Sequence, residues 1–251
     1  MEESFLKYIE DSIKTNWDRP ALTDFKGATS SYKDVARKIE KLHLLFEHCG
    51  IRKGDKIALC SRNTSNWGIA FLATLSYGAV VVPILNEFKP DNIHHIVNHS
   101  EARILFAGDI VWENLDEGAM PDLDGVIRVE DYSLRFSRQK KLTEARAKLN
   151  ELFGKKFPER FRPEDVHYDY DKLNDLALIN YTSGTTSSSK GVMLPYRSLW
   201  TNLKFALGVF GLTPGEQIVS MLPMAHMYGL AFEFIYEFAS GMHISVPYPF
   251  A

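Results

Sequence analysis

The chain has 251 residues, of which 45% are hydrophobic and 24% are charged, with a formal net charge of −3. These values are ordinary for a globular protein, and the slight negative charge argues against nucleic acid as a partner. The two cysteines, Cys49 and Cys60, are too few for a disulfide framework and indicate a reducing, cytoplasmic environment.

The first half of the chain alternates between helix-like and strand-like segments. Helices are expected over residues 4–16, from Ser31 to Cys49, from a cap at Asn63-Thr64-Ser65 to Ser76, and over Asp91–Asn98. Strands are expected at Ala21–Phe25, Lys56–Ser61, Ala79–Ile84, Arg103–Phe106 and Val126–Val129. Such alternation predicts an α/β fold with mostly parallel sheets covered by helices.

Two segments raise the question of a membrane. Trp67–Leu85 is nineteen residues without a charge, but Gly78 and Pro83 interrupt it. We interpret it as a buried helix followed by a strand, with a transmembrane span as the alternative. Residues 134–156 are predicted to form one charged helix with more Lys and Arg than acid. A solvated face is the preferred interpretation of that helix, and a membrane-surface patch is the alternative.

The most informative stretch is Leu176–Leu194. Two apolar, strand-like runs enclose a segment that is rich in hydroxyls and glycine and ends in Lys190-Gly191. Glycine lets backbone N–H groups turn toward a ligand, hydroxyls donate to phosphate oxygens, and lysine supplies positive charge. The segment is not a Walker A loop, because Ser189 precedes Lys190 and a strand follows. The pattern predicts a phosphate-binding loop, and a flexible surface loop is the alternative.

This stretch resembles the phosphate-binding signature of the adenylate-forming (AMP-binding) superfamily, usually written YTSGTTGxPKG. That superfamily includes acyl-CoA synthetases, luciferases and peptide-synthetase adenylation domains. Two positions depart from the usual pattern: Ser187 stands where glycine is commonest, and Ser189 where proline is commonest. The resemblance implies that one set of residues binds the β- and γ-phosphates of ATP, namely Thr182, Ser183, Gly184, Thr185, Thr186, Ser187 and Lys190. It also implies that Thr182 contributes an oxygen to Mg²⁺.

A second block lies after a helix expected at Tyr196–Phe210 and a strand expected at Gln217–Leu222. Leu222-Pro223-Met224-Ala225-His226-Met227-Tyr228-Gly229 resembles the LPLxH-type turn of acyl-CoA synthetases. The resemblance makes His226 the candidate catalytic residue, at the place where acyl group and adenylate meet. A histidine with a purely structural role is the alternative. The residues Leu222-Pro223-Met224-Ala225-His226 favour the long-chain fatty-acid branch of the acyl-CoA synthetases.

The resemblance covers nearly the whole chain, since Arg19–Leu22, Gly50–Ala58 and Asn63–Pro83 also match family blocks in order and spacing. It identifies residues 1–251 as the N-terminal part of the large AMP-binding domain, because members carry adenine, ribose and lid-domain blocks further on. The implied parent is a long-chain fatty-acid–CoA ligase, which uses ATP, Mg²⁺ and CoA. The 251 residues alone are expected to be inactive.

Three alternatives remain open at this point. One is another acyl- or aryl-CoA ligase or an amino-acid-adenylating domain. The first half of the family's sequence does not exclude these, because most specificity residues lie further along the chain in family members. A second is a module that binds a nucleotide or lipid without chemistry, and a third is peripheral association with a membrane. We also expect self-association near Leu230–Phe250, where an apolar helix at Ala231–Ala239 and a strand at Gly241–Tyr248 predict an unpaired sheet edge.

Overall fold

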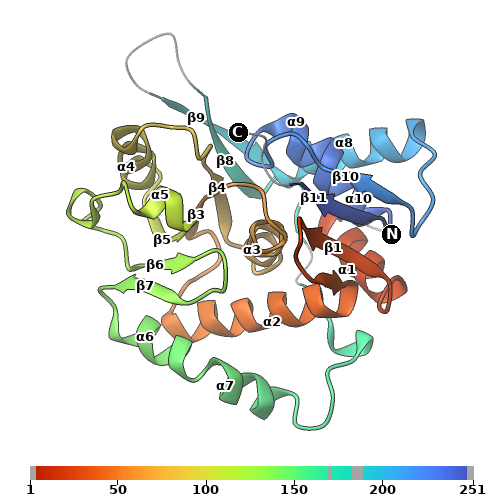
Figure 1. Cartoon of the computed structure of the whole chain (residues 1–251), viewed down its shortest axis with the longest axis horizontal. Helices are drawn as coiled ribbons and strands as arrows, with labels where there is room; N and C mark the ends of the chain where they lie inside the picture. Colours follow the sequence, from red (N-terminus) through yellow and green to blue (C-terminus); the bar gives the residue numbers. More distant parts are fainter. Residues whose placement is uncertain (1–3, 169–170, 183–188, 248–251) are drawn as a thin grey trace.

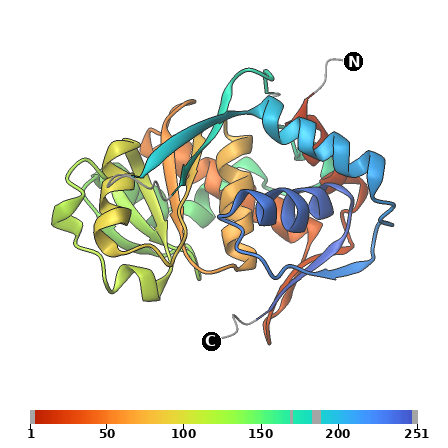
Figure 2. The same ribbon diagram turned by 90° about the horizontal axis from the view of Figure 1, so that it is seen from above.

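The computed structural model describes residues 4–168, 171–182 and 189–247. Within these residues the strands form two sheets, of seven and four strands, with helices packed on both (Figures 1 and 2). The helices are α1 (Phe5–Thr15), α2 (Tyr32–Cys49), α3 (Ser65–Ser76), α4 (Pro90–His99), α5 (Asp109–Trp112), α6 (Lys140–Ala147), α7 (Leu149–Lys156), α8 (Tyr196–Val209), α9 (Met227–Leu230) and α10 (Tyr236–Ala239). Short 3-10 turns η1 (Glu117–Ala119) and η2 (Pro163–Asp165) and a π-helical turn η3 (Ala231–Ile235) complete the helical elements described. The strands are β1 (Pro20–Asp24), β2 (Thr29–Ser31), β3 (Lys56–Cys60), β4 (Val80–Pro83), β5 (Ala102–Ala107), β6 (Gly125–Arg128), β7 (Leu134–Ser137), β8 (Leu176–Thr182), β9 (Lys190–Pro195), β10 (Gln217–Val219) and β11 (His243–Val246).

The seven-stranded sheet has the order β7-β6-β5-β3-β4-β8-β9. Its central strands are parallel, whereas β7 and β9 at the edges run antiparallel to their neighbours. One face packs on α2 and α3, and the other packs on α4. The expected α/β fold, with a mostly parallel sheet covered by helices, is therefore confirmed. The sheet differs from that expectation only in its two edge strands, which are antiparallel to their neighbours.

The uncharged stretch Trp67–Leu85 contains a buried helix, α3, and a buried strand, β4. Thr64 caps α3 by accepting a hydrogen bond from the backbone N–H of Trp67. Almost every residue of α3 is buried, because the helix lies between α2 and the sheet. Among the described residues, no helix is both long and apolar enough to cross a membrane.

The prediction of one helix over residues 134–156 is wrong. Leu134 and Phe136 alternate with Arg135 and Ser137, which is the period of a strand, and they pair with β6 to form β7. The helical part begins only at Lys140 and is divided at Lys148 into α6 and α7. Figure 1 shows these two helices lying along α2.

The four-stranded sheet, of order β10-β11-β1-β2, joins the two ends of the chain. β11 pairs in parallel with β1 on one side, through Leu22 opposite Ile244, and with β10 on the other. The prediction of an unpaired edge at this strand is therefore wrong for residues 243–246. In the helix before it, Phe234, Ile235 and Phe238 are buried, and Phe232 is half-buried.

Candidate functional site

The predicted phosphate loop connects the two strands of an antiparallel hairpin. Thr182 at the end of β8 lies opposite Lys190 at the start of β9, and both residues are exposed. Lys190 begins a strand, β9, whereas a Walker A loop is followed by a helix, so the expected difference from a Walker A loop is confirmed. Figure 1 shows the hairpin extending from the upper side of the molecule. Ser183, Gly184, Thr185, Thr186 and Ser187 lie outside the described residues.

Next to its loop, the hairpin is fixed against helix α4. The hydroxyl of Tyr181, directly before Thr182, is hydrogen-bonded to Nδ1 of His99 at 2.7 Å. Gly191 faces Tyr181 across the hairpin, and a Cβ there would lie 2.9 Å from Cγ2 of Ile179 and 3.0 Å from Cζ of Tyr181. Tyr181 is buried, and burial raises the pKa of its phenol. The exposed residues Thr182 and Lys190, at the loop end of the hairpin, therefore directly adjoin a packed pair, Tyr181 and Gly191.

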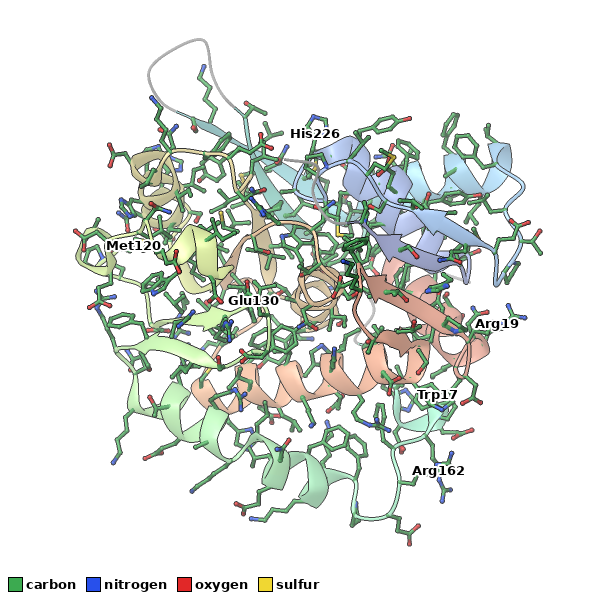
Figure 3. The ribbon with its side chains drawn as sticks, in the orientation of Figure 1. Trp17, Arg19, Met120, Glu130, Arg162 and His226 are labelled. Atoms are coloured by element: carbon green, nitrogen blue, oxygen red, sulfur yellow. The ribbon has the colours of Figure 1, made fainter. Side chains whose placement is uncertain are left out.

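His226 lies in the turn between β10 and α9 and is the N-cap residue of α9. Its backbone N–H donates to the carbonyl of Pro223 at 2.9 Å, and its Nδ1 accepts from the backbone N–H of Tyr228 at 3.3 Å. The imidazole is exposed, whereas Met224 and Ala225 before it are buried and anchor the turn. Figure 3 places His226 on the upper side of the molecule, where Figure 1 shows β8 and β9. The two candidate elements thus share one side of the fold.

The predicted metal ligand Thr182 lies at the loop end of β8. The exposed hydroxyl of Thr182 at the end of β8 is an oxygen donor of the kind Mg²⁺ accepts. In residues 4–168, 171–182 and 189–247, no cluster of three or more His, Cys, Asp or Glu is arranged to hold a metal ion. Thr182 therefore fits as one ligand of a magnesium ion that ATP and other groups would hold.

Two cavities border the parallel sheet. One, of about 650 Å³, lies over β8 and β9 beside the end of α4, and Tyr181, His99 and Gly191 are among its lining residues. The other, of about 340 Å³, lies beyond the carboxyl ends of β3, β4 and β5, where Asn86 and Asp109 contribute to its wall. Crevices at the carboxyl ends of parallel strands are common ligand sites in α/β folds.

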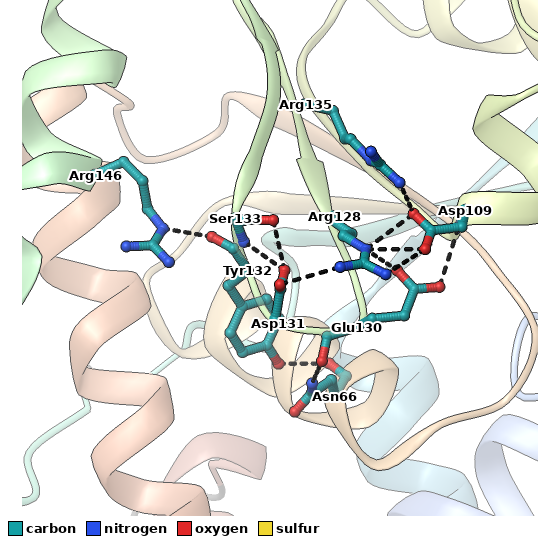
Figure 4. A network of polar contacts seen from close by, with 9 residues as sticks. All are labelled: Asn66, Asp109, Arg128, Glu130, Asp131, Tyr132, Ser133, Arg135 and Arg146. Carbon is teal, nitrogen blue, oxygen red and sulfur yellow. Dashed lines mark hydrogen bonds and ion pairs between the residues drawn. The ribbon is translucent and has the colours of Figure 1, made fainter.

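A polar network stiffens the sheet edge next to the smaller cavity (Figure 4). The carboxylate of Asp109 accepts hydrogen bonds from the guanidinium groups of Arg128 and Arg135, which lower the pKa of that carboxyl. Asn66 on α3 donates from Nδ2 to the carbonyl of Glu130 at 2.8 Å. These bonds connect α3, α5 and the β6–β7 turn.

Two residues that hold the His226 turn were not predicted from the sequence. Asn63 was expected to help cap α3, but Thr64 alone is the cap, and the Asn63 side chain instead contacts the backbone of the turn. Glu233 accepts hydrogen bonds from two backbone N–H groups of the same turn, those of Met221 and Leu222. Neither pairing has a local sequence signal, because both depend on the folded chain.

Comparison with known proteins agrees with this arrangement. The AMP-binding enzyme family model matches residues 9–251. The chain is 27% identical over 217 residues to long-chain-fatty-acid–CoA ligase 5 of Rattus norvegicus, a match that covers 79% of this chain and 30% of the relative. It is 31% identical over 235 residues to the peroxisomal long chain acyl-CoA synthetase 6 of Arabidopsis thaliana, covering 88% of this chain and 31% of the relative.

Solved structures show the same fold. The anthranilate CoA ligase AuaEII, in complex with anthranoyl-AMP, superposes with a TM-score of 0.81 at 17% identity, over 99% of this chain and 45% of that one. The chain belongs to the AMP-binding enzyme family and has the fold of the N-terminal domain of adenylate-forming enzymes. It spans about 30% of the length of the two curated relatives described above.

Proposed function

We propose that this chain is the phosphate-binding part of an ATP-dependent long-chain fatty-acid–CoA ligase. The hairpin carries the proposal, because Thr182 and Lys190 close a loop of the family's phosphate-binding composition at an exposed end. The long-chain fatty-acid branch is supported by the two curated relatives and by the amino-acid sequence around His226. Residues 1–251 would be the N-terminal part of the large AMP-binding domain.

The proposed reaction has two steps. A carboxylate attacks the α-phosphorus of ATP to give an acyl-adenylate and pyrophosphate, and the thiol of CoA then attacks the acyl carbon and releases AMP. Lys190 and the loop hydroxyls would neutralise and orient the β- and γ-phosphates, so that the carboxylate approaches in line with the leaving pyrophosphate. Magnesium bound with the triphosphate would supply further positive charge there. His226 would contact the junction of acyl group and adenylate.

The proposal predicts that the variant Lys190→Ala binds ATP more weakly than the native chain. Its affinity for ATP should fall by about tenfold or more, because a charge-assisted contact to phosphate contributes roughly 1.5–3 kcal/mol. Isothermal titration of the 251-residue chain with Mg·ATP measures this, and tripolyphosphate should compete. Lys140→Ala is the matched control, since Lys140 is exposed and pairs with Glu144 at 3.5 Å on α6. Equal affinities in the native chain and Lys190→Ala would contradict the phosphate role.

We further expect that the 251-residue polypeptide alone does not form acyl-CoA. The resemblance assigns the adenine, ribose and adenylation-lysine contacts to later blocks of the family. Incubation with a long-chain fatty acid, ATP and CoA, followed by thioester detection, measures this. Product formation well above that of Lys190→Ala would show that these 251 residues suffice.

We also propose where the protein is located in the cell and what it associates with. We expect a cytoplasmic protein that can associate peripherally with a membrane or with itself. The exposed apolar side chains of Val192 and Met193 on β9, and of Met221 and Leu222 in the turn that carries His226, support this. Liposome sedimentation and light scattering at micromolar concentration separate the two kinds of association.

A further inference from the structure

The turn that carries His226 is held by a side chain from a distant part of the sequence. Asn63 lies between β3 and the start of α3. Its Oδ1 accepts a hydrogen bond from the backbone N–H of Met224 at 2.8 Å, and its Nδ2 donates to the carbonyl of Leu222 at 2.7 Å. A primary amide can satisfy a donor and an acceptor at once, and Asn63 uses both functions on the same turn.

A second side chain holds the turn from the helix that follows it. Oε2 of Glu233 accepts hydrogen bonds from the backbone N–H groups of Met221 and Leu222, at 2.6 and 2.7 Å. Bonds of this kind, from an amide to a carboxylate, are stronger than those between neutral groups. Glu233 lies on the π-helical turn η3, and such turns are frequent at functional sites. The irregular helix therefore places this carboxylate beneath the segment before His226.

The two anchors belong to elements that are packed tightly together. Asn63 directly precedes Thr64, the cap of α3, and Glu233 lies on η3. At Gly68 on α3, a Cβ would lie 2.5 Å from Cε2 of the Phe234 ring on η3. Because α3 and η3 approach so closely, Asn63 and Glu233 form one rigid support for the turn.

The His226 ring itself has little direct support. It is exposed, and within the part of the chain that the structure describes its side-chain hydrogen bond is the 3.3 Å bond from the N–H of Tyr228. Its position therefore follows from the backbone of the turn, which Asn63 and Glu233 bind at three N–H groups and one carbonyl. We infer that Asn63 and Glu233 are positioning residues for His226 in acyl-adenylate binding. This inference rests on the proposed function of His226.

The test compares two asparagines three residues apart. Asn63→Ala removes both bonds to the His226 turn, and Asn63→Asp keeps the acceptor for the N–H of Met224. Asn66→Ala is the matched control, because Asn66 makes a similar bond to the carbonyl of Glu130 (Figure 4), and Glu130 lies away from His226 (Figure 3). Each is made in the 251-residue chain, with the thermal midpoint recorded to compare overall stability.

The first readout is the turn itself, by NMR. In Asn63→Ala, the amide of Met224 should exchange with solvent about tenfold faster, and the ring signal of His226 should shift. Asn63→Asp should restore part of the amide protection, and Asn66→Ala should change neither signal. The inference is overturned if the Met224 amide and the His226 ring are unchanged in Asn63→Ala, or if they change equally in Asn66→Ala.

The second readout is binding of a non-hydrolysable acyl-adenylate analogue, a long-chain acyl sulfamate of adenosine. Asn63→Ala and Glu233→Ala should each weaken binding by about tenfold, and Asn66→Ala should not. If the native chain binds the analogue and Asn63→Ala binds it equally well, the positioning role is wrong. If the native chain does not bind it, the proposed contact of His226 with the acyl-adenylate fails, whereas phosphate binding by the β8–β9 hairpin is tested separately by Mg·ATP, and the NMR comparison still decides whether Asn63 sets the position of His226.

Discussion

Replacing Glu237 by glutamine is expected to raise the free energy of unfolding by about 4 kcal/mol near pH 8 and to change it little near pH 4. Glu237 lies on α10 and is only 5% exposed. Among the described residues, its Oε2 has no hydrogen-bond partner. Burial, and to a lesser extent the nearby carboxylate of Glu233, raises the pKa of the Glu237 carboxyl from its ordinary value of 4.5 to about 8.

The direction of the effect follows from proton linkage. The unfolded chain loses the Glu237 proton above about pH 4.5, whereas the folded chain keeps it until about pH 8. The contribution of this group to stability is therefore complete below pH 4.5 and decreases as the pH rises to 8. Glutamine has the same shape and does not ionise, so the variant should lack this part of the pH dependence.

Urea unfolding across this pH range measures the effect. Glu159→Gln is the control, because the Glu159 side chain is largely exposed and pairs only loosely with Arg162. It should retain the pH profile of the native chain. Identical profiles for Glu237→Gln and the native chain would show that folding does not raise the pKa of the Glu237 carboxyl.

The variant Gly229→Ala should lose about 1–3 kcal/mol of stability and displace the His226 turn. A Cβ at Gly229 would lie 2.5 Å from the carbonyl oxygen of Pro223, a backbone atom that cannot move without the chain. That carbonyl accepts the hydrogen bond from the N–H of His226. Relieving the clash therefore requires the turn to open at this bond.

A second helical glycine provides the control for Gly229. Gly208 on α8 is exposed, and a Cβ there would have no atom within 4 Å. Gly208→Ala should therefore stabilise the chain by up to about 1 kcal/mol, as expected for alanine in a helix. Thermal unfolding of both variants, with the His226 ring signal recorded by NMR, tests the difference. A Gly229→Ala chain as stable as Gly208→Ala would mean that the turn has room at this position.

Features governed by neighbouring residues were predictable from the sequence. Ser31 and Asp34 form a capping box at the start of α2, and Gly50 ends that helix with a left-handed φ of 85°, a conformation glycine adopts without strain. The strands on either side of the phosphate loop were also predictable, because apolar runs enclose a turn-forming segment. These signals predict the position of the hairpin along the chain, although they do not predict that β8 pairs with β4.

Features that depend on distant contacts were not predictable. The parallel pairing of Leu22 with Ile244 joins the two ends of the chain, and this pairing makes β11 an interior strand. Asn63 has the composition of a helix cap, yet its amide binds a turn about 160 positions later. A capping residue and a long-range anchor have the same sequence signature, so only the folded chain distinguishes them.

In the proposed function, the loop end of the β8–β9 hairpin binds the triphosphate of ATP. Paramagnetic broadening of backbone amide signals by Mn·ATP tests it directly, because Mn²⁺ replaces Mg²⁺ on the phosphates and broadens the signals of nearby nuclei. We predict the strongest broadening at Thr182, Lys190 and Gly191, and a weaker effect at the His226 turn. Strongest broadening elsewhere, for example at Asn86 and Asp109 in the smaller cavity, would contradict the account.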